Sequence, residues 1–238
     1  MFVKTSFKRY CARNSLIRLG NSHHKVLRTR CAPGIQLPAK EVVEEGVSVV
    51  FSKYLPKSPI KNDGETAHYA PLASILNACV ETSNKIVNDH QIIPKTAMQW
   101  FDSLIFIPWA RPTADGVDGA PPLHPDLAGI RGSPTADPPV LYWGHIEVHT
   151  GGRRLLIPIE VKGSDAEMVK QAVTYARALN SATIFWAFEL VLGYNYVSDR
   201  FRFFIFHRGG VSSSEGISLY KKSTSDLADL LRFHHDLD

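Results

Sequence analysis

Two charged side chains end the apolar run LLIPIEVK, at residues 155–162. Glu160 and Lys162 are two residues apart, and because alternate residues of a strand point to the same side, a carboxylate and an ammonium emerge together. A second carboxylate, Asp126, lies beside another short apolar segment in the stretch HPDLAGI. Two carboxylates and one lysine could hold a divalent cation and orient a water molecule.

This set of residue types suits the hydrolysis of a phosphodiester. The reaction needs a hard cation that withdraws charge from the phosphate, and a nearby water that is made nucleophilic. Mg²⁺, or Mn²⁺ in its place, prefers carboxylate and other oxygen ligands. We therefore expect Asp126 and Glu160 to bind the metal, and Lys162 to orient the water or to stabilise developing charge.

Two helices are predicted around these residues. Apolar side chains recur at three- and four-residue steps over residues 65 to about 89 and again over residues 165–180. Asp63 or Thr66 would cap the first helix, and Ser164 or Asp165 would cap the second.

Apolar runs typical of strands occupy most of the remaining sequence between residues 98 and 207. These runs cover residues 98–109, 124–131, 141–150, 153–162, 184–191 and 201–207. Turn residues between neighbouring runs, at Gly151-Gly152 and over Gly193-Tyr194-Asn195 and Ser198-Asp199, predict two hairpin turns. The order of helix, strands, helix and strands predicts an α/β domain with a mixed central sheet flanked by helices.

Residues 1–40 differ in composition from the rest of the chain. They contain nine of the 27 Lys and Arg residues and no Asp or Glu, so residues 41–238 carry the other 18 basic side chains and all 23 acidic ones. We expect a basic segment over residues 1–40, either a disordered tail or a mitochondrial targeting sequence, followed by one domain over residues 41–238. The excess positive charge lies in the first segment, so it is weak evidence that the domain binds polyanions.

Cysteine usage and hydropathy indicate the compartment. Three cysteines, odd in number and widely spaced, argue against a disulfide framework and for a reducing environment. No apolar run approaches the roughly 20 residues that span a bilayer. We expect an intracellular protein without a membrane partner, nuclear or cytoplasmic unless residues 1–40 direct it to mitochondria. A secreted effector whose basic segment guides its uptake is a further interpretation.

A second group of metal-binding residue types is a weaker candidate. His145, Glu147 and His149 alternate, so they share one face of the expected strand. Three such residues spread over about 13 Å, too far for one ion without other ligands. A solvated strand face is the better interpretation.

The residues Pro125-Asp126 and Glu160-Val161-Lys162 spell the motif of the PD-(D/E)XK nuclease superfamily, which the chain also resembles in the order of its elements. The resemblance implies a restriction-endonuclease-like fold. In many members the helix after the Glu-x-Lys strand contributes a polar group, here Gln171, as a catalytic residue. The first helix often adds an acidic metal ligand, which matches Glu65, although Glu81 lies on the same expected helix.

A narrower resemblance extends from about residue 65 to the end of the chain. The segments YAPLASILN, HPDLAGI, LLIPIEVK and QAVTYARAL, and the strand pair that ends at residues 207–210, are similar to the domain that precedes the catalytic domain in fungal-type protein kinases. The glycine-rich loop, His-Arg-Asp and Asp-Phe-Gly motifs of kinases do not occur in these 238 residues.

Two functions follow from the resemblance. The first is a Mg²⁺-dependent nuclease that cleaves DNA or RNA. The alternative is a non-catalytic domain that regulates or binds a kinase domain or another protein partner. The acidic character of residues 41–238 favours the alternative, because a nuclease groove usually presents positive charge to phosphate.

Overall fold

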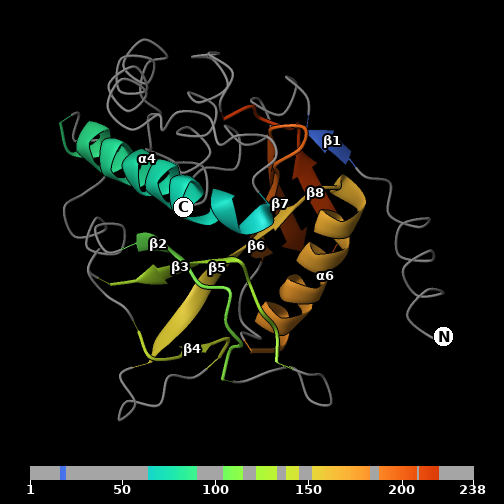
Figure 1. Ribbon diagram of the computed structural model, residues 1–238, viewed down its shortest axis with the longest axis horizontal. Helices are drawn as coiled ribbons and strands as arrows, with labels where there is room; N and C mark the ends of the chain where they lie inside the picture. Colours follow the sequence, from blue (N-terminus) through green and yellow to red (C-terminus); the bar gives the residue numbers. More distant parts are fainter. Residues whose placement is uncertain are drawn as a thin grey trace.

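A mixed, open β-sheet forms the centre of the protein, with one helix packed against each face (Figure 1). The computed structural model describes residues 17–19, 64–89, 104–114, 122–132, 138–144, 152–182, 188–207 and 209–219. The elements in chain order are β1 (Ile17–Leu19), the 3-10 helix η1 (Glu65–His68), α4 (Tyr69–Asp89), β2 (Leu104–Pro108), β3 (Leu127–Arg131), β4 (Leu141–Tyr142), β5 (Arg153–Lys162), α6 (Asp165–Ala182), β6 (Phe188–Asn195), β7 (Arg200–His207) and β8 (Gly210–Ser214).

Seven strands pair in the order β1-β8-β7-β6-β5-β3-β2, and β4 pairs with β5 outside this path. Strands β2, β3 and β5 are antiparallel neighbours, as are β6, β7 and β8. The two groups join where β5 and β6 pair in parallel. A parallel pair needs a crossover connection, and α6 lies within the chain that provides it. The α/β class and the mixed sheet expected from the sequence are therefore confirmed.

Both predicted helices are present at the predicted places. The first starts as η1 and continues as α4 to Asp89, but its cap differs from the expectation: Thr66 lies inside η1, Gly64 is the capping residue without a side-chain bond, and Asp63 lies outside the described residues. The second helix, α6, begins at Asp165, and the Ser164 hydroxyl accepts a hydrogen bond from the Glu167 N–H at 3.3 Å. Ser164 is therefore the cap that the sequence predicted.

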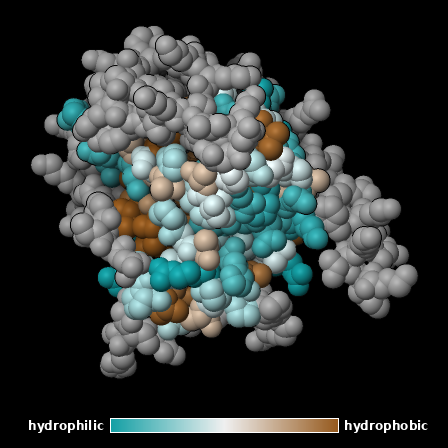
Figure 2. Space-filling model, viewed as in Figure 1, coloured by the Kyte–Doolittle hydropathy of each residue, from teal (hydrophilic) through white to brown (hydrophobic). Residues whose placement is uncertain are grey.

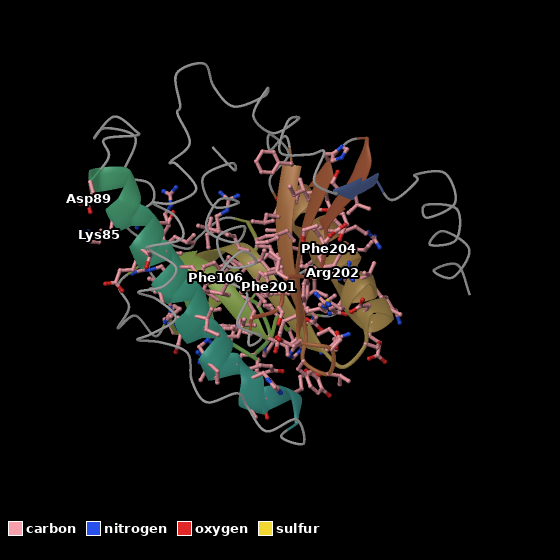
Figure 3. All side chains as sticks on the ribbon, turned by 90° about the horizontal axis from the view of Figure 1, so that it is seen from above. Lys85, Asp89, Phe106, Phe201, Arg202 and Phe204 are labelled. Atoms are coloured by element: carbon pink, nitrogen blue, oxygen red, sulfur yellow. The ribbon has the colours of Figure 1, made fainter. Side chains whose placement is uncertain are left out.

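The sheet carries a separate apolar core on each face. Alternate residues of a strand point to opposite faces, so Phe201 and Phe203 pack with α4 whereas Phe204 and Phe206 pack with α6. Figure 3 shows Phe201 on the side of α4 and Phe204 toward α6. The outer surface over α6 is largely hydrophilic (Figure 2), as expected for a helix with one buried side.

The two predicted turns differ in part from the structure. Gly193 lies inside β6 rather than in a turn, and it is a glycine because a side chain there would collide with α6: a Cβ atom would come 2.5 Å from the Met168 Sδ. The predicted pair of strands, β6 and β7, is confirmed, and its turn at residues 196–199 contains the predicted Ser198-Asp199. Strand β4 pairs in parallel with β5, so residues 141–142 do not form the hairpin expected at Gly151-Gly152.

Several expectations concern residues outside those described. One is the group His145, Glu147 and His149. Another is the division of the chain at residue 40, because only residues 17–19 of the basic segment are described, as β1. Within the described part of the chain, neither helix has the length and apolar character needed to cross a membrane.

A close approach of β3 to its neighbours leads to a stability prediction. A Cβ atom on Gly129 would lie 2.9 Å from the Ile157 Cβ and 2.9 Å from the Phe106 Cε1. We expect Gly129→Ala to lower the free energy of unfolding by about 1–3 kcal/mol through overpacking. A matched control is Gly64→Ala, where a Cβ atom meets none of the described atoms within 4 Å; its effect should stay within about 0.5 kcal/mol. Urea unfolding of both variants measures the difference, and equal losses would contradict the packing described for β3.

Candidate functional site

The antiparallel pairing of β3 and β5 brings two carboxylates together at one end of the sheet. Leu127 of β3 is the register partner of Ile159 of β5, so Asp126 and Glu160 lie at adjacent strand positions. The Asp126 N–H donates to the Ile159 carbonyl at 3.1 Å, and the Asp126 Oδ2 accepts from the Val161 N–H at 2.8 Å. Both side chains are buried, with 7% of Asp126 and 2% of Glu160 exposed.

Lys162 joins three carboxylates at this end of the sheet. Its Nζ lies 2.8 Å from the Glu160 Oε1, 2.8 Å from the Glu65 Oε1 and 3.4 Å from the Asp126 Oδ2. We call Glu65, Asp126, Glu160 and Lys162 the carboxylate–lysine cluster. Glu65 comes from η1, which contacts β5 although the two are far apart in sequence (Figure 1). Four residues that the sequence predicted at the site, three carboxylates and one lysine, are thus brought together.

The competing acidic residue on the first helix is elsewhere. Glu81 is exposed on α4, more than four helical turns beyond Glu65. Geometry therefore favours Glu65 over Glu81 as a further oxygen ligand, which the sequence alone did not decide.

Each helix contributes one buried tyrosine whose hydroxyl contacts the carboxylates. The Tyr175 hydroxyl of α6 donates to the Glu160 Oε2 at 2.6 Å and lies 2.8 Å from the His124 carbonyl oxygen. The Tyr69 hydroxyl of α4 lies 2.5 Å from the Asp126 Oδ1 and 2.9 Å from the Glu65 Oε1. Asp126 and Glu160 are therefore positioned from opposite faces of the sheet.

Gln171 lies next to one of these tyrosines rather than among the carboxylates and Lys162. It is one turn before Tyr175 on α6, and its side chain opposes the burial that raises the pKa of the Tyr175 hydroxyl. No contact of Gln171 with Glu65, Asp126, Glu160 or Lys162 is found among the described residues.

The tyrosines are the residues that sequence reasoning missed. Tyr69 and Tyr175 fit the apolar sides of their helices, which gave no reason to place them at the site. Tyr175 is fully buried, with its hydroxyl on Glu160. One signal was present: Gln171 and Tyr175 are four residues apart and share a helix face.

The electrostatics of the cluster keep the lysine charged and favour protonation of Glu160 and Asp126. Burial is the main cause that raises the pKa of Glu160 to about 7, the charge of Asp126 adds to it, and hydrogen bonds from Lys162 and Tyr175 oppose it. Burial also raises the pKa of Asp126, although Tyr69 and the Val161 N–H favour its charged form. Burial disfavours the Lys162 ammonium, but hydrogen bonds to Glu160 and Glu65 outweigh it and raise the pKa of Lys162.

The donor set has the chemistry that a hard divalent cation requires. Three carboxylates converge on a single positive group, and oxygen ligands are those that Mg²⁺ and Mn²⁺ prefer. That positive group is the Lys162 ammonium, which occupies the place between the carboxylates. Among the described residues, no group of three or more His, Cys, Asp or Glu side chains is arranged so that it could hold a metal in this state. Binding a metal through these carboxylates would therefore require a change in the contacts of Lys162.

Comparisons with protein-family models, with curated proteins and with solved structures find no match for this chain.

The raised pKa of Glu160 predicts how stability depends on pH. Between the ordinary pKa of 4.5 and about 7, the unfolded chain loses the proton of Glu160 while the folded protein keeps it. Because the folded state then binds more protons, this group lowers stability as pH rises through that range, by up to about 3 kcal/mol. Glu160→Gln removes the titration, so we expect its melting temperature to rise relative to the wild type from pH 5 to pH 8.

Thermal melts in EDTA over this range check the prediction, with Glu81→Gln as the control because Glu81 is exposed. A gap between Glu160→Gln and the wild type that is independent of pH, or that closes toward pH 8, would show that Glu160 is ionised throughout.

Proposed function

We propose that the protein is a metal-dependent nuclease with a PD-(D/E)XK fold that hydrolyses phosphodiester bonds in DNA or RNA. The observation that carries this proposal is the convergence of Glu65, Asp126 and Glu160 on Lys162 at one end of the sheet. A group of three acids, of which Asp126 and Glu160 are buried, is costly to maintain for stability alone, since replacing buried ion pairs by apolar residues is often neutral or stabilising. Such clusters are more common where chemistry requires them.

Each residue of the cluster has a role in this proposal. Asp126 and Glu160, with Glu65 in support, would hold Mg²⁺ or Mn²⁺, which when bound polarises the phosphate and activates a water. Lys162, kept protonated by its raised pKa, would orient the water or stabilise negative charge on the phosphate as a hydrogen-bond donor. Its charge makes it unsuited to accept a proton as a general base.

The tyrosines and Gln171 would act by positioning. Tyr175 fixes the second oxygen of Glu160, so that the Oε1 faces Lys162. Gln171, one turn before Tyr175 on the same helix, would act through Tyr175 rather than on the substrate. Preorganised ligands of this kind reduce the reorganisation that the reaction requires.

The second candidate is a non-catalytic domain that binds or regulates a partner such as a kinase domain. It is supported by the charge of residues 41–238, where 23 acidic side chains exceed the 18 basic ones. A net acidic surface lacks the broad positive field that attracts nucleic acid. In this reading the carboxylate–lysine cluster would be a structural remnant of the fold. An intracellular location, with nuclear, cytoplasmic and mitochondrial alternatives, stays a prediction from the sequence.

Cleavage assays separate the two candidates. With Mg²⁺ or Mn²⁺ present, we expect the wild type to cut single- or double-stranded DNA or RNA, and EDTA to stop it. Glu160→Ala and Lys162→Ala should each lower the rate at least about 100-fold, because each removes a charge that acts on the reacting phosphate or its metal. The matched control Glu81→Ala, at an exposed site on the same helix as Tyr69, should keep wild-type activity.

Absence of cleavage by the folded wild type across both metals and all four kinds of substrate would reject the nuclease. Cleavage that persists in Glu160→Ala would instead show that the activity does not come from the carboxylate–lysine cluster.

A further inference from the structure

The contacts of Lys162 use its full donor capacity. An ammonium carries three N–H groups and accepts no hydrogen bond. Three carboxylates lie around the Lys162 Nζ, at 2.8, 2.8 and 3.4 Å. In this arrangement each donor faces an acid, so none is directed at a water or a phosphate. The role of Lys162 in hydrolysis therefore requires that some of these contacts be given up.

We propose that Lys162 is a built-in counter-ion that competes with the divalent cation for the same carboxylate oxygens. The ammonium and the metal are alternative partners of Glu65, Asp126 and Glu160, and binding of the metal releases Lys162 toward the substrate. This inference rests on the metal site of the proposed function, and it adds how that site is regulated. The metal would then both complete the site and set free the donor that the reaction uses.

The carboxylates are fixed by bonds that do not involve Lys162. Asp126 is held by the Val161 N–H at 2.8 Å and by Tyr69 at 2.5 Å, and Glu160 is held by Tyr175 at 2.6 Å. Tyr69 also contacts Glu65 at 2.9 Å. When Lys162 leaves, each carboxylate group keeps at least one of these partners. The ligand geometry can therefore survive the exchange.

Lys162 is free to move relative to the two strand carboxylates. Its side chain is 25% exposed, compared with 3% for the side chain of Glu160 and 10% for that of Asp126, while that of Glu65 is 32% exposed. The ammonium sits on a flexible four-carbon stem at the last position of β5, directly before the Gly163-Ser164 link to α6. A change of its rotamers needs no movement of the sheet.

Charge favours the exchange in the same direction. When ionised, the three carboxylates carry more negative charge than one ammonium neutralises, and those of Asp126 and Glu160 are largely removed from water. A divalent cation supplies twice the charge of the ammonium at the same oxygens. Lys162 therefore lowers the affinity of the site for a metal without preventing its binding.

The test measures metal binding rather than cleavage. We would titrate Mn²⁺ into the folded protein by calorimetry, comparing the wild type with Lys162→Met, which keeps an unbranched side chain and removes the charge. We expect Lys162→Met to bind Mn²⁺ at least about 10-fold more tightly. Its melting temperature should lie several degrees below that of the wild type in EDTA, and Mn²⁺ should raise it more than it raises the wild type.

Two further variants control for charge and position. Lys162→Arg keeps a cation among the carboxylates and should bind Mn²⁺ no more tightly than the wild type. Lys85→Met removes a lysine from an exposed ion pair with Asp89 on α4, and its Mn²⁺ affinity should be unchanged. Equal affinity of Lys162→Met and the wild type would overturn the competition but leave the nuclease proposal intact.

Other outcomes also discriminate. If neither protein binds Mn²⁺, both the competition and the metal-dependent nuclease fail. Tighter binding by Lys162→Met, in a protein whose wild type cleaves nothing, would support the competition and reject only the nuclease. If Lys162→Met does not fold, the ¹⁵N signal of the Lys162 ammonium in the wild type provides the answer. It should shift or broaden as Mn²⁺, or diamagnetic Mg²⁺, is added, and an unchanged signal at saturating Mg²⁺ would overturn the competition.

Discussion

The interaction on which the site depends is the contact of one ammonium with three carboxylates at the end of β5. Charges taken out of water are tolerated only when each has a partner. The loss of one member of the cluster therefore leaves the others buried without the interaction that offsets their desolvation. Lys162 meets acids from η1, from the residue before β3 and from β5 itself. Tyr69 and Tyr175 then tie this cluster to the helices on the two faces of the sheet. The packing of α4 and α6 and the geometry of the carboxylates are therefore linked.

Most of the fold followed from periodicity in the sequence. The three- and four-residue spacing that predicts α4 and α6 reflects burial of one helix side, and the apolar runs of β5, β6 and β7 reflect strands covered on both faces. Glycine was the source of error. It serves turns, but it also permits close packing, and Gly193 is needed where Met168 of α6 approaches β6. The parallel pairing of β4 could not be predicted, because strand direction depends on contacts distant in sequence.

The site could be predicted where it depends on local spacing. Glu160 and Lys162 share a strand side, and Asp126 precedes the neighbouring strand, so their convergence followed from strand geometry together with the expected pairing. The contact of Glu65 with Lys162 joins residues 97 positions apart and depends on how η1 lies against β5. The tyrosines were overlooked for a different reason. Their rings fit the apolar pattern of a helix, and this pattern does not indicate which group the hydroxyl contacts.

The central claim is that a divalent metal binds to the carboxylate–lysine cluster. The most direct measurement is a crystal structure of the protein with Mn²⁺, using the anomalous scattering of manganese to locate it. The account predicts one peak within coordinating distance, about 2.0–2.4 Å, of oxygens of Asp126 and Glu160, with the Lys162 Nζ moved away from at least one carboxylate. Lys162 still in contact with all three acids at saturating Mn²⁺, with no peak between them, would contradict it.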